Sequence, residues 1–228
     1  MIDNIKRKNI MINKQGYDHD FYEKNNQDFL VFDENIKIVI DGCGSLEFSE
    51  VGVRLFAQFI RDYIEVITVD NFKSIINQVF ERLIDINFND EFLYNNFSFT
   101  ILACIENEEE FVVFSCGDGY IITKNQDKIE FIELDDGEYP KYYIYNYIVE
   151  KEEMIKYNEG VDFTINRFSK EEFENVGVAT DGLRFYEDLN ILEKNKMIDY
   201  LEKGRNAQIG MIINRNKKTF KDDITICF

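Results

Sequence analysis

Strand-like and helical segments of this chain fall into separate blocks along the sequence. The strand-like runs are rich in β-branched and aromatic residues, and they are 29–33, 36–41, "FSFTILACI", "EFVVFSCGDGYIITK", "KIEFIEL" and the C-terminal "DITICF". The helical runs repeat apolar residues at helical spacing, and they are Ser49–Ile67, Asn71–Ile86, 188–203 and 205–215. Segregated blocks favour an α+β fold, with two sheets covered by helices, over a doubly wound parallel sheet. The three runs in the middle of the chain predict an antiparallel meander.

Composition limits the domain count and the class of partner. The 228 residues include no internal repeat, no low-complexity linker and a single proline, so we expect one domain over residues 1–228. Apolar residues make up 45% of the chain, which argues for a folded core. The formal net charge of −18 argues against a surface for nucleic acid or anionic membrane, because both require a basic footprint.

The chain has no apolar run near the roughly 18 residues that a membrane span requires. Its start, "MIDNIKRKNIM", also lacks the hydrophobic core of a signal peptide, so a cytoplasmic location is expected. The four cysteines are far apart and form no C-x-x-C pair, which predicts reduced core residues and not a zinc or redox site.

Four aspartates fall at the ends of four probable core strands. They are Asp41 after "KIVI", Asp118 after "FVVFSCG", Asp181 after "VGVAT" and Asp222 before "ITICF". Three of the four belong to Asp-Gly pairs, each of which taken alone is typical of a hairpin turn. If the strand ends converge, the carboxylates repel one another and are costly to bury unless cations lie between them. Oxygen ligands of this kind suit Mg²⁺ or Mn²⁺, and the pattern therefore predicts a metal site.

Other chemistries do not fit these residues. An EF-hand loop starting at Asp41 would need oxygen donors at its third and fifth positions and glycine at its sixth, where the chain has Cys43, Ser45 and Leu46. The segments around Cys43 and Cys116 contain no His or Arg that would activate a cysteine nucleophile. No G-x-S-x-G elbow is present for a serine triad.

An ordered series of motifs resembles the metal-dependent type 2C protein phosphatases. The motifs are "NNQDF", "VIDGCGS", "FSFTILACI", "CGDGYIIT", "VATDGL" and "KDDITICF", and together they extend from about Gly16 to the C-terminus. The opening "GYDHDFYEKNNQD" is similar to the bacterial branch of that family, and His19, the single histidine, falls within it. The resemblance implies a four-layer α-β-β-α sandwich in which two antiparallel sheets are flanked by helices.

The resemblance also implies roles for individual residues. Asp41 would bridge two metal ions, Gly42 would offer its carbonyl, and Asp181 and Asp222 would complete the ligand shell. Asp28 would act through bound water, and Asp118 resembles an acid associated with a weaker third metal. Asp223 stands where the family often has Asn, so it is expected to be a neighbour of the site and not a ligand.

The implied activity is hydrolysis of phosphoserine or phosphothreonine on proteins by a water activated by two Mn²⁺ or Mg²⁺ ions. A phosphoprotein is the expected partner, and a cognate serine/threonine kinase would oppose the reaction. Many relatives carry a phosphate-binding arginine where this chain has Glu23. His19 could replace it as phosphate ligand or proton donor, or be a solvated loop histidine. An alternative function is therefore a catalytically weak or inactive phosphatase-like module that binds a phosphorylated partner.

The tyrosine-rich stretch "YPKYYIYNYIVEKEE" alternates Tyr143, Tyr145 and Tyr147 with Ile144 and Ile148. This alternation predicts an amphipathic strand. A second interpretation is a recognition flap, in which the tyrosines contact a phosphoprotein partner.

Overall fold

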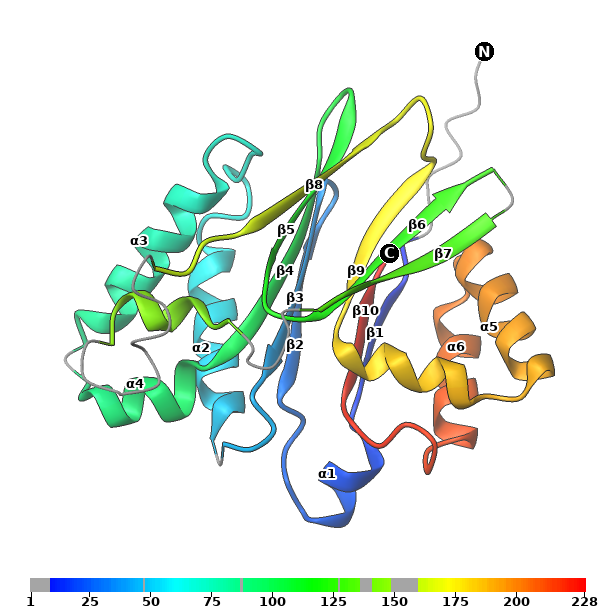
Figure 1. Cartoon of the computed structure of the whole chain (residues 1–228), viewed down its shortest axis with the longest axis horizontal. Helices are drawn as coiled ribbons and strands as arrows, with labels where there is room; N and C mark the ends of the chain where they lie inside the picture. The colour runs from blue at the N-terminus through cyan, green and yellow to red at the C-terminus, as the bar shows by residue number, and fades with distance from the viewer. Residues whose placement is uncertain (1–8, 47, 87, 127, 136–140, 149–159) are drawn as a thin grey trace.

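Two five-stranded antiparallel sheets lie face to face at the centre of the molecule, and helices cover both outer faces (Figure 1). The computed structural model describes residues 9–46, 48–86, 88–126, 128–135, 141–148 and 160–228. Neighbouring strands pair in antiparallel register throughout both sheets. The arrangement confirms the expected four-layer α-β-β-α sandwich.

Sheet A contains both ends of the described chain. Its strands, in spatial order, are β1 (Met11–Lys14), β10 (Ile224–Cys227), β9 (Asn175–Ala179), β6 (Gly119–Asn125) and β7 (Lys128–Leu134). Helices α5 (Ile191–Glu202) and α6 (Asn206–Arg215) lie on its outer face, with the 3₁₀ helix η3 (Asp181–Asp188) directly after β9 (Figure 1).

Sheet B forms the second central layer. Its strands, in spatial order, are β2 (Asp28–Asp33), β3 (Ile36–Gly42), β4 (Phe99–Glu106), β5 (Glu110–Cys116) and β8 (Thr164–Ser169). Its outer face is covered by α2 (Ser49–Arg61), α3 (Phe72–Ile84) and α4 (Asp90–Phe97) (Figure 1). The short helix α1 (Tyr17–Phe21) joins β1 to β2 near the ends of both sheets.

Helical spacing of apolar residues explains how α2 packs on sheet B. Val53, Phe56, Ala57 and Ile60 follow the i, i+3, i+4, i+7 pattern and are buried in one cluster with the strands. The helix ends at Arg61 and not at the expected Ile67. A loop follows, in which Asn71 accepts a hydrogen bond from the Thr68 amide and donates one to the Val66 carbonyl.

A lysine joins the two sheets in their shared interior. Lys37 on β3 is 3% exposed, and its Nζ atom donates to the carbonyl of Val176 at 2.6 Å and to Oδ1 of Asn175 at 2.8 Å. A buried ammonium is tolerated when such acceptors surround it. The contact fixes β3, which delivers Asp41, against β9, which leads to Asp181.

The expected meander is wrong, because the run "EFVVFSCGDGYIITK" divides between the sheets. Its first half is β5 of sheet B, and its second half is β6 of sheet A. The turn is made by Gly117 and Gly119, whose φ angles are +101° and +139°. Side chains rarely adopt such backbone conformations, and a Cβ on Gly117 would also lie 2.5 Å from the Thr100 side chain. Local patterning alone could not reveal this crossover.

The expected tyrosine strand is also wrong. Tyr143–Asn146 forms the 3₁₀ helix η1, in which Tyr143 and Ile144 are buried against the helices of sheet B. Tyr143 donates a hydrogen bond from its hydroxyl to Oδ1 of Asn77 on α3 at 2.6 Å. Consecutive residues are buried here, whereas a half-buried strand buries every second one. The flanking residues of the expected flap, 136–140 and 149–159, lie outside the described residues.

Five elements of the structure lay outside the sequence expectations: β1, β8, α1, α4 and η3. All are short, and short elements carry a weak periodic signal. Within the described ranges, no helix combines the length and apolar character needed to cross a bilayer.

Candidate metal centre

Strand ends from both sheets deliver carboxylates to one small cavity. Asp41 comes from β3, Asp118 from the β5–β6 turn, Asp181 from the start of η3, and Asp222 from the segment before β10. The cavity has a volume of about 110 Å³ and is lined by Asp41, Gly42, Cys43, Gly44, Thr100, Asp118, Tyr142, Asp181 and Asp222. Five of the six expected metal-site residues therefore line it.

Asp41 lies at the centre of this group of acids. Burial raises its pKa well above the ordinary range, and the negative charges of Asp28, Asp181 and Asp222 raise it further. Burial also raises the pKa of Asp181, to about 6, although the nearby Arg184 guanidinium opposes the shift. These shifts indicate that the folded protein holds its carboxylates together at an electrostatic cost, which divalent cations would relieve.

Asp28 lies behind the cavity and not on its wall. It is 4% exposed and faces Asp41 directly across the β2–β3 pair. Thr180 donates a hydrogen bond from Oγ1 to Oδ2 of Asp28 at 2.7 Å, and the same Oγ1 accepts from the Thr225 amide at 2.9 Å. Burial, together with repulsion from Asp223, raises the pKa of Asp28 to about 8. This position suits an acid that contacts the cavity through an intervening group.

Close packing of two backbone segments brings Asp181 and Asp222 together. A Cβ atom on Gly182 would lie 1.9 Å from the carbonyl oxygen of Asp223. Glycine is therefore required immediately after Asp181, since any side chain would separate η3 from β10. The Asp-Gly pair serves this close approach in place of the hairpin turn that the sequence alone also allowed.

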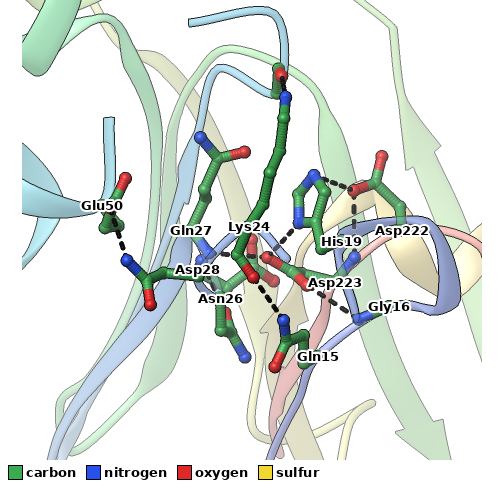
Figure 2. Close-up of polar contacts among 12 residues, drawn as sticks. Gln15, Gly16, His19, Lys24, Asn26, Gln27, Asp28, Glu50, Asp222 and Asp223 are labelled. Atoms are coloured by element: carbon green, nitrogen blue, oxygen red, sulfur yellow. Dashed lines mark hydrogen bonds and ion pairs between the residues drawn. The ribbon is translucent and has the colours of Figure 1, made fainter. Parts of the chain in front are cut away.

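His19 is buried between two acids. It is therefore not a solvated loop histidine, which was one of the two interpretations of the sequence. Its exposure is 8%, its Nδ1 lies 2.8 Å from Oδ2 of Asp223, and its Nε2 lies 3.8 Å from Oδ1 of Asp222 (Figure 2). The hydrogen bond with Asp223 raises the pKa of His19 against the opposing effect of burial. Since a carboxylate accepts at Nδ1, a protonated His19 directs its second N–H from Nε2 toward the Asp222 side.

Asp223 is fixed by donors from three directions. Besides His19, the amide of Gly16 donates to its Oδ1 at 2.8 Å and the amide of Gln27 donates to its Oδ2 at 2.6 Å (Figure 2). The side chain is 2% exposed and does not line the cavity. Its contacts anchor α1 and β2 to the start of β10, and they agree with the expectation that Asp223 is a neighbour of the site.

Arg184 was not among the expected site residues, yet it contacts two of them. Its Nη2 lies 2.7 Å from Oδ2 of Asp181 and 3.5 Å from Oδ2 of Asp222. The 3₁₀ geometry of η3 places it beside Asp181 three residues earlier. The sequence signal was an arginine closely following the "TDG" motif, and its second contact depends on the distant β10 segment.

Three observations bear on whether these residues fit divalent cations. Across the described ranges, no three His, Cys, Asp or Glu side chains already surround one point in a geometry for a single ion. The donors are nevertheless hard oxygens, as Mg²⁺ and Mn²⁺ prefer. In addition, Thr100, the cross-strand neighbour of Asp41, has a buried hydroxyl without a hydrogen-bond partner among the described residues. A hydrated cation would give that hydroxyl a partner, so the residues fit such an ion.

Comparison with known proteins decides the family. The sequence model described as "Protein phosphatase 2C" matches residues 15–208. The chain belongs to the protein phosphatase 2C family. This confirms the resemblance drawn from the motifs. No curated protein matched this phosphatase 2C chain.

Solved bacterial structures share the phosphatase 2C fold of this chain. A bacterial serine phosphatase is 14% identical, with 96% of each chain covered and a TM-score of 0.66. Staphylococcus aureus Stp1, a serine/threonine phosphatase, is 14% identical over 96% of this chain and 93% of its own, with a TM-score of 0.63. The catalytic domain of the serine/threonine phosphatase PstP, solved with 2 manganese ions, is 11% identical over 96% and 95%, with a TM-score of 0.60. At identities this low, the structural similarity establishes a common fold.

Proposed function

We propose that this phosphatase 2C chain is a single catalytic domain, residues 1–228, that hydrolyses phosphoserine and phosphothreonine on proteins. One observation carries the proposal: carboxylates from four separate strand ends line one cavity of about 110 Å³. Sequence-distant acids gathered at such electrostatic cost are typical of functional sites. Family membership supports the reaction class, and the solved bacterial relatives are themselves described as serine or serine/threonine phosphatases.

The residues that would hold two Mn²⁺ or Mg²⁺ ions are Asp41, Gly42, Asp181 and Asp222, with Asp118 at a third, weaker site. When bound, such ions supply an activated water and the positive charge that attracts a phosphate dianion to a chain of net charge −18.

Two other residues of the site have different roles. Thr180 holds a carboxylate in place, and His19 transfers a proton. Thr180 turns its hydroxyl proton to Asp28, which keeps that carboxylate directed toward Asp41. His19, held at Nδ1 by Asp223, presents Nε2 as the atom that would donate a proton to the departing serine or threonine oxygen. The partner is then a phosphoprotein, and a serine/threonine kinase would generate it.

Metal-dependent turnover tests the proposal. Purified protein with Mn²⁺ or Mg²⁺ should release phosphate from p-nitrophenyl phosphate and from a phosphothreonine peptide. Asp41→Asn should lower kcat by at least about 10²-fold, because it removes a charge that the ions require. Asp70→Asn is the matched control, since Asp70 is an exposed aspartate in the turn before α3. Turnover that survives Asp41→Asn, or that needs no metal, would contradict the mechanism.

A second function is a binding module that holds a phosphorylated partner without turnover. Glu23 favours it, because this exposed acid stands where many relatives carry a phosphate-binding arginine. The module predicts tight binding of the phosphothreonine peptide with no phosphate release at any metal concentration. Metal-dependent release from the peptide would exclude it.

A further inference from the structure

A second cavity, of about 360 Å³, adjoins the carboxylate cavity on the side of α1. Gly44 and Asp222 line both cavities, so the two share a boundary. Its other charged or titratable lining residues are Asp18, His19, Tyr22, Lys24, Arg184 and Lys221. Three permanent cations thus face one cavity in a chain with only 26 Lys and Arg against 44 Asp and Glu. We call this cavity the cationic pocket.

We propose that the cationic pocket binds the phosphate group of the substrate and that Arg184 is its principal ligand. The proposal rests on the proposed function, because the phosphate must reach the carboxylate cavity to react. A dianion at the boundary formed by Gly44 and Asp222 would lie between the two cavities. It would have the carboxylate-held ions on one side and the cations of the pocket on the other.

The Arg184 side chain is partly exposed and has spare hydrogen-bond donors, as a phosphate ligand requires. Its side chain is 49% exposed, and Nη2 is the guanidinium nitrogen that contacts both carboxylates, Asp181 at 2.7 Å and Asp222 at 3.5 Å. A guanidinium has five N–H donors in a planar fork, so the others can serve a phosphate. Its two partners are the acids proposed to hold metal. Divalent cations would neutralise these acids and weaken their attraction for the guanidinium, which could then turn to the substrate.

Two lysines supply further charge to the pocket. Lys24 donates from Nζ to the carbonyl of Gly44 at 2.8 Å, which places its ammonium at the boundary and leaves two of its three N–H donors for other partners (Figure 2). Lys221 is exposed and takes part in none of the ion pairs within the described part of the chain. Asp18 also lines the pocket and would repel an anion from its own side, toward Arg184.

The pocket also accounts for the exposed Glu23, whose backbone adopts a left-handed conformation with φ of 57°. An acid at this position cannot serve as the phosphate ligand that the resemblance implied. The guanidinium is supplied instead by Arg184 of η3, which lines the cationic pocket. The phosphate-binding guanidinium then comes from a different element than in relatives that carry an arginine at the position of Glu23.

Calorimetric titration with inorganic phosphate tests the proposal directly. Mg²⁺-loaded protein should bind phosphate, and Arg184→Ala should weaken that binding by at least about tenfold, since a charge-assisted bidentate contact is lost. Arg184→Lys should give an intermediate affinity, because lysine keeps the charge but not the fork. Lys221→Ala should weaken binding by about two- to fivefold, as expected for one exposed charge. Arg215→Ala, an exposed arginine at the end of α6, is the matched control and should leave it unchanged.

A kinetic arm separates recognition of phosphate from recognition of peptide. Arg184→Ala should raise KM for the phosphothreonine peptide and for p-nitrophenyl phosphate alike, while excess unphosphorylated peptide should not inhibit the wild type. Wild-type phosphate affinity in Arg184→Ala, or no phosphate binding by the wild type, would overturn the proposal. A wild type that binds phosphate but has no turnover would refute only the proposed function. Melting curves establish whether each variant is folded. If Arg184→Ala does not fold, the phosphate affinity of Lys221→Ala tests the pocket in its place, and an unchanged affinity would overturn the proposal.

Discussion

The hydroxyl of Thr180 donates a 2.7 Å hydrogen bond to Oδ2 of Asp28, and this contact joins the two sheets at the candidate metal centre. Thr180 follows β9 of sheet A, whereas Asp28 begins β2 of sheet B, and 152 positions separate them in the sequence. The Thr225 amide occupies the acceptor side of the hydroxyl, so its proton is directed to Asp28. The relative position of the sheets is thereby coupled to the orientation of a buried acid.

Replacement of Thr180 by valine should destabilise the protein and weaken metal binding. Thr180→Val keeps the side-chain volume but removes one of the hydrogen-bond donors to buried Asp28, which costs about 1–3 kcal/mol for a buried polar group. Urea unfolding measures the stability and calorimetry measures the Mn²⁺ affinity. Thr68→Val, at an exposed threonine, is the control. Equal stability of Thr180→Val and the wild type would show that the bond has no structural role.

The stability of the metal-free protein should fall as pH rises from about 4 to about 8. The pKa of Asp181 is raised from 3.8 to about 6 and that of Asp28 to about 8, so the folded state keeps protons that the unfolded chain releases. The raised pKa of His19 acts in the same direction, because its contribution is complete below pH 6.5 and is lost above the folded pKa.

Urea unfolding at several pH values, with EDTA or with Mn²⁺, measures this dependence. Cations favour ionised carboxylates, so Mn²⁺ should stabilise the protein more at pH 8 than at pH 5 and should release protons on binding. Stability in EDTA that is constant or rises over this range would contradict the assigned shifts.

The unpaired hydroxyl of Thr100 leads to a prediction with opposite signs for stability and binding. Thr100→Val replaces a buried hydroxyl that lacks a partner with a methyl group, so the metal-free protein should gain about 1 kcal/mol. The same change removes from the cavity wall a hydroxyl that would contact a hydrated cation, so it should weaken Mn²⁺ binding. Unfolding in EDTA and calorimetry measure the two effects. A loss of stability in EDTA would mean that the hydroxyl already has a partner.

A single methyl group added at Gly182 should strongly destabilise the protein. Gly182→Ala would place Cβ 1.9 Å from the Asp223 carbonyl, and backbone displacement should cost more than about 3 kcal/mol. Gly44→Ala is a matched control in the same region, because its Cβ would meet nothing nearer than 3.8 Å. Thermal unfolding compares the two variants. Similar melting temperatures would show that η3 and β10 can separate without loss.

Patterns along the chain were sufficient for the fold class and for the four aspartates that line the carboxylate cavity. Asp41 and Asp222 flank runs of apolar residues, and an acid at the end of a buried strand is a local signal. The same patterns failed at Gly117, where one apparent strand run crosses between sheets. They also failed at Tyr143, whose alternating neighbours form a 3₁₀ helix. In both places the outcome depends on packing partners that are distant in sequence.

The presence of acids at the ends of core strands follows from local sequence patterns, because composition and periodicity are properties of short segments. Long-range packing, by contrast, sets which acids meet, places Asp28 behind the cavity, and brings Arg184 to Asp222 from another element. The burial of His19 against Asp223 was decided in the same way. Such contacts depend on the stacking of two sheets, each of which includes strands that are distant in sequence, and no local pattern encodes that stacking.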